Sequence, residues 1–328
     1  MNEMLIFLIV AGLSYFYAFF SGIGDAANAL STAISTRSLS FNKALVLGFI
    51  MQLFGGLVGT GVAVTISSGL VMIDKISLEV VLAGILAMLI WSVFTYIFSI
   101  PVSDTHSLVG ALLGASIAMG GLNIIVWGGL IKVVSAMLFS PILGFLGGYF
   151  LLHMITKIVH AKSTTSMRSL FKKLIILMAG FTSFSNGLNN NQKPVGIILI
   201  ALVLYTGINS HIVPMWLIVS VAITQAFGVI WGTRLIKTMG SRIIQLSTEQ
   251  GFCAQASAAT VLQLTSWLGI PVSTTQVITS SIVGAGVSRR IGSVRWQVVK
   301  DIGTSWLLTL PASFTMGWVL SSLFLWLK

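Results

Sequence analysis

Long apolar stretches separated by short polar connections dominate the chain. Runs such as 81–100 and 133–152 are almost wholly apolar, and each is about as long as an α-helix that crosses a bilayer. Strands of a membrane barrel would alternate apolar and polar residues, so helices are expected. About eight to eleven membrane segments of this length would fit along the chain. The pattern predicts an all-α polytopic membrane protein.

Composition excludes a soluble protein. Hydrophobic residues make up 56% of the 328 residues and charged residues 8%, against about 45–50% and about 25% in soluble domains. The formal charge of +11 comes from basic residues in the short connections, which is typical of cytoplasmic loops. We therefore expect contact with membrane lipid and no nucleic-acid partner. The one cysteine, Cys253, leaves no intramolecular disulfide or cysteine-based metal site.

The basic residues also predict the topology. Arg37 and Lys43 follow the first apolar segment, which places this connection inside and the N-terminus outside. The largest basic cluster lies in 157–173 and is expected to be a cytoplasmic linker. It divides the chain into a first transmembrane repeat, 1–156, and a second, inverted repeat, 174–328.

Two motif pairs relate these halves. Phe20-Ser-Gly-Ile-Gly-Asp-Ala-Ala-Asn28 corresponds to Phe184-Ser-Asn-Gly-Leu-Asn-Asn-Asn-Gln-Lys193, and Ile100-Pro-Val-Ser-Asp-Thr-His106 reappears as Ile270-Pro-Val-Ser-Thr-Thr-Gln276. The order and spacing are nearly the same in both halves. Duplication with inverted topology explains this pattern, and in secondary transporters it places the substrate where the halves meet.

Each motif has the chemistry of a polar site within a membrane. Gly and Pro interrupt the apolar runs and Ser, Thr, Asn or Asp follow, which predicts broken helices or re-entrant hairpins. The segments after Pro101 and Pro271 resemble helix N-termini, where unpaired N–H groups and the helix dipole attract an anion. We expect two such N-termini to meet around an oxyanion.

Together these motifs resemble the inorganic phosphate transporter (PiT) family from about Phe20 to Arg290. The resemblance implies a secondary active importer of inorganic phosphate in the cell membrane, driven by sodium or protons, and a possible homodimer. It implies no cofactor apart from a possible bound sodium ion. From the resemblance, and from the cost of charged residues within apolar segments, we expect the substrate-binding residues to be Asp25, Asn28, Ser103, Asp104, Thr105, Asn190, Lys193, Ser273, Thr274 and Thr275. On the same grounds we expect the coupling-ion residues to be Asp25, Asn28, Asn189, Asn190 and Asp104.

The chain departs from the family pattern at five positions. Gly24 stands where the family usually has Asn, Asn190 where it has Asp, Gln255 where Glu is common, and Gln276 where His is usual. Asp104 occupies a position that is usually Ser or Thr. Because the acid at 190 is missing, we expect fewer coupling ions than in a typical sodium-driven member.

Charged residues within apolar segments are costly and usually functional. Asp25 and Asp104 are therefore the strongest candidates, although Asp is also a good helix cap. Lys193 could contact phosphate, neutralise a carboxylate, or extend to the cytoplasmic interface.

Sulfate is the closest alternative substrate, because it shares the size and shape of phosphate. Only phosphate can donate a hydrogen bond to a carboxylate at neutral pH, so Asp25 and Asp104 favour phosphate if either faces the anion. An anion channel lined by hairpins is a further alternative. A membrane enzyme is less favoured, because the sequence lacks recognisable hydrolase and metalloprotease motifs.

Overall fold

The computed structural model describes residues 2–98, 100, 102–159, 164–208, 212–233 and 246–327. Within these ranges the regular structure is helical, with one isolated bridge between Val71 and Ile125. The prediction of an all-α protein is confirmed. The first half contains α1 (Glu3–Ser35), α2 (Phe41–Gly56), α3 (Gly61–Ser68), η1 (Ile73–Lys75), α4 (Leu78–Ile97), α5 (Asp104–Gly120), η2 (Gly121–Ile124) and α6 (Trp127–Val159). The second contains α7 (Thr164–Asn190), α8 (Gln192–Thr206), α9 (Met215–Trp231), α11 (Thr248–Trp267), α12 (Thr274–Arg289), η3 (Ile291–Ser293) and α13 (Trp296–Trp326).

Fewer of the described helices than expected are apolar and long enough to cross a membrane alone. Five helices meet both criteria, or six if the bent pair α2 and α3 counts as one span, against the eight to eleven expected. Helices such as α7, α11 and α12 carry many Ser, Thr, Asn and Gln residues. They can do so because other helices bury much of their surface.

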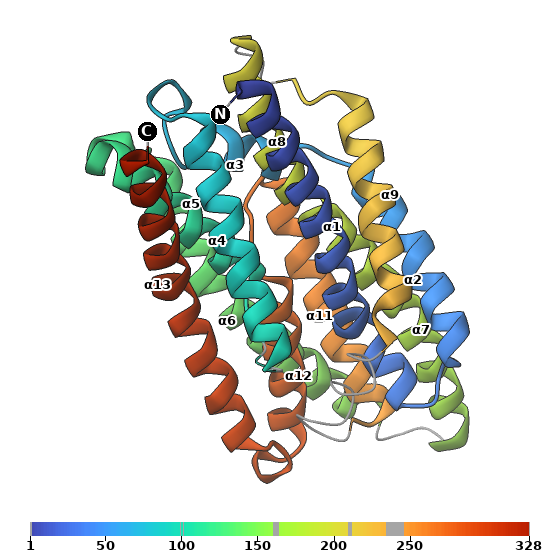
Figure 1. Ribbon diagram of the computed structural model, residues 1–328. Helices are drawn as coiled ribbons and strands as arrows, with labels where there is room; N and C mark the ends of the chain where they lie inside the picture. The colour runs from blue at the N-terminus through green and yellow to red at the C-terminus, as the bar shows by residue number, and fades with distance from the viewer. Residues whose placement is uncertain are drawn as a thin grey trace.

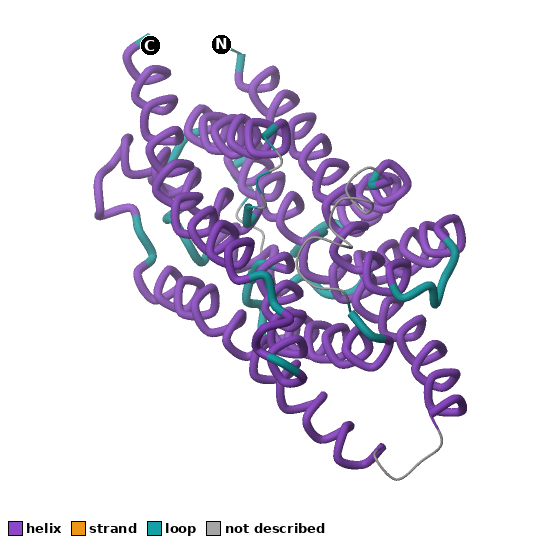
Figure 2. The backbone as a smooth tube through the Cα atoms, turned by 90° about the horizontal axis from the view of Figure 1, so that it is seen from below, coloured by secondary structure: helices purple, strands orange, loops and turns teal. Residues whose placement is uncertain are grey.

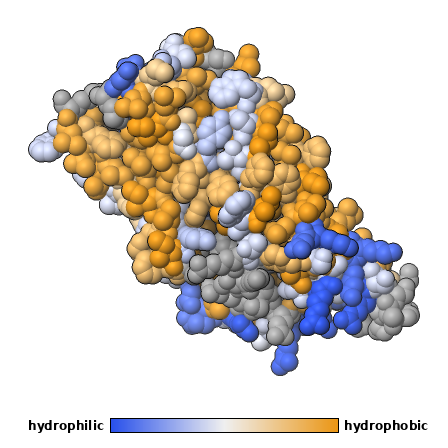
Figure 3. Space-filling model, turned by 45° about the vertical axis from the view of Figure 1, so that its right-hand side comes forward, coloured by the Kyte–Doolittle hydropathy of each residue, from blue (hydrophilic) through white to orange (hydrophobic). Residues whose placement is uncertain are grey.

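Large apolar side chains cover much of the outer surface. Phe139 in α6 and Leu307 in α13 are among many that are exposed. In Figure 3 apolar residues cover most of the visible face and the most hydrophilic residues gather at its lower end. An apolar band above a hydrophilic end is the surface of a protein embedded in lipid.

The element order of the first half recurs in the second. The series α4, α5, η2, α6 is matched by α11, α12, η3, α13, and Pro141 in α6 corresponds to Pro311 in α13. In Figure 1, α6 runs downward and α13 upward, and both chain termini lie at the upper end. This arrangement is consistent with two repeats of inverted topology.

Helices of one half pack mainly on helices of the other. Helix α13 lies along α5 and α12 along α6, while α2 packs on α7 and α1 on α9; Figure 2 shows the bundle from below. At two of these crossings a glycine faces a backbone carbonyl: a Cβ on Gly114 would lie 2.0 Å from the oxygen of Phe314, and one on Gly284 would lie 2.0 Å from that of Phe145. The repeat therefore extends to individual helix contacts.

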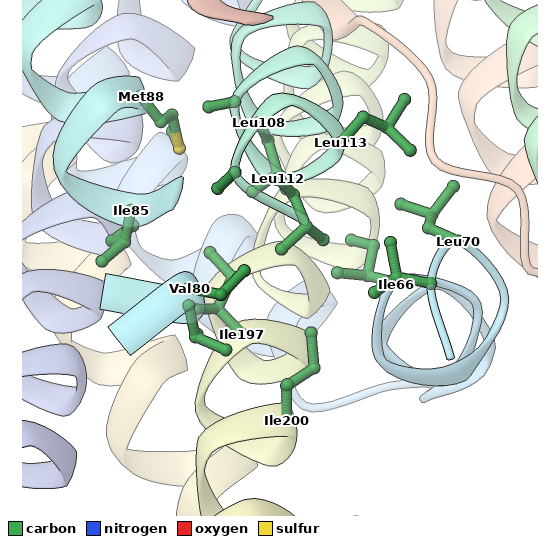
Figure 4. Close-up of a cluster of buried hydrophobic side chains, with 14 of the residues drawn as sticks. Ile66, Leu70, Val80, Ile85, Met88, Leu108, Leu112, Leu113, Ile197 and Ile200 are labelled. Atoms are coloured by element: carbon green, nitrogen blue, oxygen red, sulfur yellow. The ribbon is translucent and has the colours of Figure 1, made fainter. Parts of the chain in front are cut away.

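A hydrophobic cluster joins α8 to five α-helices of the first half, α1, α3, α4, α5 and α6. Its members include Ile66 of α3, Val80 and Ile85 of α4, Leu112 of α5 and Ile197 of α8, as Figure 4 shows. Val10 of α1 belongs to the same cluster. The cluster holds α8 against the first half, and with α8 the residues at its start.

The predicted interruptions occur at the hairpins. Helix α4 ends at Ile97 and α5 begins at Asp104, while α11 ends at Trp267 and α12 begins at Thr274. Pro101 lies outside the described residues, as do residues 160–163 of the expected linker.

The prediction of a break at the Asp25 motif is wrong. Helix α1 is continuous from Glu3 to Ser35, and α7 continues to Asn190 before the chain passes through Asn191 into α8. Gly22 permits close contact with α9 rather than a break, because a Cβ there would lie 2.0 Å from the carbonyl oxygen of Gln225. The structure instead has an unpredicted bend of 62° between α2 and α3.

Replacement of Gly114 or Gly284 by Leu should lower the melting temperature of the detergent-purified protein. The new side chain must push the facing helix away, and overpacking of this kind typically costs about 1–3 kcal/mol. Gly303→Leu in α13 is the matched control, because nothing lies within 4 Å of its Cβ position. Equal melting temperatures for the control and the two test variants would contradict these helix contacts.

Candidate functional site

Asp25 of α1 lies at the centre of a buried hydrogen-bond network. Its carboxylate is 2% exposed and accepts from three side-chain amides. Asn190 Nδ2 donates to Oδ1 at 2.6 Å, while Gln52 Nε2 and Gln225 Nε2 donate to Oδ2 at 2.8 and 3.0 Å. Helices α1, α2, α7 and α9 thus meet at one carboxylate.

Asn190 extends this network to Lys193 and to the second hairpin. Its Nδ2 also donates to Thr274 Oγ1 at 3.1 Å, and its Oδ1 accepts from Lys193 Nζ at 2.5 Å. Lys193 Nζ donates to the carbonyl of Val272 at 3.2 Å. Lys193 is only 1% exposed, so it does not extend to an interface.

The two Pro-Val-Ser segments end in capped helix N-termini. The hydroxyls of Ser103 and Ser273 accept from the backbone N–H groups of His106 and Gln276, at 3.2 and 3.3 Å. In the first turns, the N–H groups of residues 104, 105, 274 and 275 have no acceptor among the described residues. Each N-terminus therefore presents free donors and the positive end of its dipole.

Direct contacts join the two hairpins and α1. Thr105 Oγ1 donates to the carbonyl of Val272 at 2.8 Å, and Asn28 Nδ2 donates to Thr275 Oγ1 at 3.0 Å. The Val272 carbonyl is thus shared by Thr105 of the first half and Lys193 of the second. The expected meeting of the two halves at one polar region is present in the structure.

Most of the predicted site residues lie in this region. Asp25, Asn28, Asn190, Lys193, Thr105, Thr274 and Thr275 form the contacts above, and Ser103 and Ser273 cap the adjoining helices. Asp104 begins α5 and is partly exposed. Asn189 points elsewhere, because its Nδ2 donates to Ser266 of α11 at 3.0 Å.

Gln52 and Gln225 were not among the predicted site residues. They belong to a third repeated motif, Gln52-Leu-Phe-Gly55 and Gln225-Ala-Phe-Gly228. The packing repeats as well: Cβ atoms on Gly22 and Gly187 would lie 2.0 and 2.2 Å from the carbonyl oxygens of Gln225 and Gln52. The repeated Gln-Xaa-Phe-Gly was the signal that could have identified both amides.

The residues that follow Asn190 hold the bend between α2 and α3. Asn191 Nδ2 donates to the carbonyl of Gly56 at the end of α2, at 2.7 Å. Gln192 Oε1 accepts from the N–H groups of Val62 and Ala63 in the first turn of α3, at 2.7 and 3.3 Å. Asn190 of the candidate site is therefore followed directly by Asn191 and Gln192, which satisfy the backbone groups freed by the bend.

The donor set fits a hard monovalent cation better than a transition metal. Among the described residues no three His, Cys, Asp or Glu side chains lie together in a metal-binding cluster. Oxygen atoms are plentiful, and the buried oxygens of Ser21 and Gln225 have no hydrogen-bond partner in the described part of the chain. Oxygens of this kind, with the Asp25 carboxylate, could coordinate sodium.

Comparisons with known proteins agree on one family. Residues 21–317 match the profile described as "Phosphate transporter family". A "Probable low-affinity inorganic phosphate transporter" of Rhizobium meliloti (strain 1021) is 35% identical over 322 residues, which cover 95% of this chain and 96% of that protein. A protein of the same description from Bacillus subtilis (strain 168) is 34% identical over 320 residues, or 95% and 94% of the two chains.

A solved structure has the same fold. "The sodium-dependent phosphate transporter" superposes with a TM-score of 0.89 and 23% sequence identity. The match covers 99% of this chain and 100% of that one.

Gln52→Leu and Gln225→Leu should each destabilise the purified protein. Each change removes a donor from a buried carboxylate, and a hydrogen bond to a charged group typically contributes about 1.5–3 kcal/mol. Gln297→Leu is the control, since Gln297 makes the same kind of bond, to Asp301 at 3.0 Å, on the exposed surface. Thermal denaturation in detergent measures the difference, and equal effects in all three variants would argue against the Asp25 network.

Proposed function

The chain belongs to the phosphate transporter family, and from this we propose that it is a secondary active transporter that imports inorganic phosphate across the cell membrane. Sodium or protons would drive the uptake. The observation that carries the proposal is the meeting of two capped helix N-termini, α5 and α12, beside the buried ammonium group of Lys193. Because the family consists of transporters, the membrane-enzyme alternative is excluded.

Phosphate would bind between the two hairpins. Free N–H groups in the first turns of α5 and α12 and the hydroxyls of Thr105, Thr274 and Thr275 can donate to its oxygens. Lys193 adds a positive charge to the same region, and Asn28 and Asn190 connect it to α1. Ser103 and Ser273 would act mainly by holding the two N-termini in position.

The coupling cation would bind next to Asp25. The three groups that donate to this carboxylate are neutral amides, and Lys193 reaches it only through Asn190, so a sodium ion or a proton can bind the carboxylate directly and neutralise its charge. Asn28, Asn190 and Asp104 lie in the same region and remain our candidates for further contacts. Asn189 stays a prediction, and its bond to Ser266 must break or rearrange if its amide is to coordinate the ion.

The orientation follows from the basic residues. We place the linker 157–173 in the cytoplasm, where the positive-inside rule puts Lys157, Arg168, Lys172 and Lys173. The N-terminus lies at the opposite end of the molecule (Figure 1) and would therefore be outside, together with the C-terminus. The homodimer implied by the family resemblance also remains a prediction.

Asp25→Asn should abolish phosphate accumulation while the protein remains folded in the membrane. The substitution keeps the shape of the side chain but removes the charge that a coupling cation must neutralise. Uptake of radiolabelled phosphate into proteoliposomes measures the effect, and Asp301→Asn on the exposed surface of α13 is the control. Transport by Asp25→Asn at the unmodified rate would remove Asp25 from the coupling site.

The dependence of phosphate uptake on sodium should show whether sodium or protons drive transport. Uptake is measured with an inward sodium gradient, without sodium, and with an inward proton gradient alone. With Asn190 in place of an acid, we expect fewer cations per phosphate than in a typical sodium-driven member. Uptake that is unchanged without sodium excludes sodium coupling, and uptake that never exceeds the electrochemical gradient of the anion indicates a channel.

A further inference from the structure

The two carboxylates of the site differ in their freedom to bind a ligand. Asp25 is almost fully buried and already accepts three hydrogen bonds. Asp104 is partly exposed, and within the described ranges no group donates a hydrogen bond to it. Asp104 is therefore the carboxylate with free acceptor positions.

The groups around Asp104 are those that attract an anion. Lys193 Nζ and Thr105 Oγ1 donate to the same carbonyl, that of Val272, at 3.2 and 2.8 Å, so the ammonium group lies beside the first turn of α5, where Asp104 is the first residue. Asp104 itself begins α5, next to the free N–H groups of that N-terminus. An anion that contacts Lys193 and these N–H groups must therefore come close to the Asp104 carboxylate.

Tyr17 provides a second, independent indication of a ligand. Its side chain is 1% exposed, and its hydroxyl has no partner among the described residues. It lies in α1, as Asp25 does, and packs in the hydrophobic cluster that contains Leu108 of α5. A buried hydroxyl without a partner is costly, and an oxyanion bound beside Asp104 could satisfy it.

A carboxylate in an anion site selects for protonated anions. Sulfate has no proton at neutral pH and would be repelled, whereas hydrogenphosphate can donate its hydroxyl to the carboxylate oxygen. We propose that Asp104 is a specificity-determining residue that accepts a hydrogen bond from the hydroxyl of phosphate and thereby excludes sulfate. This inference rests on the proposed function, since it assigns one residue of the same site.

The second half provides the matched substitution. Thr274 occupies in α12 the position that Asp104 occupies in α5: each is the first helical residue after its Ser cap. A threonine hydroxyl can both donate and accept, so it tolerates an oxygen with or without a proton. Asp104→Thr makes the two N-termini alike and removes only the selective group.

The test is competition against radiolabelled phosphate uptake in proteoliposomes at fixed neutral pH. The competitors are arsenate, which keeps an ionisable hydroxyl, and sulfate and monofluorophosphate, dianions that lack one. The unmodified protein should be inhibited by arsenate only. In Asp104→Thr the half-inhibitory concentrations of sulfate and monofluorophosphate should fall at least about tenfold, because the repulsion between the Asp104 carboxylate and an unprotonated dianion is removed. Glu249→Gln, which changes a partly buried acid in the first turn of α11, should leave the selectivity unchanged.

Each outcome bears on a different claim. If the unmodified protein takes up no phosphate, the proposed function fails. If it takes up phosphate but Asp104→Thr still excludes sulfate and monofluorophosphate, only the role of Asp104 is overturned. If Asp104→Thr transports nothing, equilibrium binding to purified Asp104→Asn decides: gain of sulfate binding supports the inference, and no gain overturns it.

Discussion

The need to satisfy one buried carboxylate organises the centre of this protein. A charge within a membrane protein is stable only when other groups solvate it, and no single helix here could do so for Asp25. Its three amide donors come from α2, α7 and α9. The close contacts at Gly22 and Gly187 bring these helices near enough for short side chains to reach. Close packing and charge solvation are thus parts of the same constraint.

The two halves make unequal contributions to the charge of the site. Both carboxylates, Asp25 and Asp104, come from the first half, where the second has Asn190 and Thr274 at the matching positions. The second half instead provides Lys193 at the place of Asn28. The fold is nearly symmetric whereas its electrostatics are not, which suits a site that must hold an anion and a cation side by side.

The sequence predicted the all-α class, the hairpins and most of the residues that meet between the two hairpins and α1, because polar motifs duplicated within apolar segments are typical of a buried site built by two repeats. Of the three amides that donate to Asp25, it predicted Asn190 only. It failed where spatial packing decides. Gly22 suggested a helix break, yet α1 is continuous because the glycine makes room for α9. The bend at α2 and α3 was missed since the amides that stabilise it, Asn191 and Gln192, lie far along the chain. Apolar spacing also does not show which of the described helices can be more polar because other helices enclose them, as α7, α11 and α12 are.

The contact of α7 with α2, and of α12 with α6, has a consequence for biosynthesis. The ribosome releases the first half before the second, so Asp25 enters the bilayer while Asn190 and Gln225 are still untranslated, and only Gln52 follows it closely. Helices α7 and α12 are too polar or too short to pass as independent spans, but the first half is already present when they emerge. The early segments therefore serve as the scaffold on which the later, more polar ones insert.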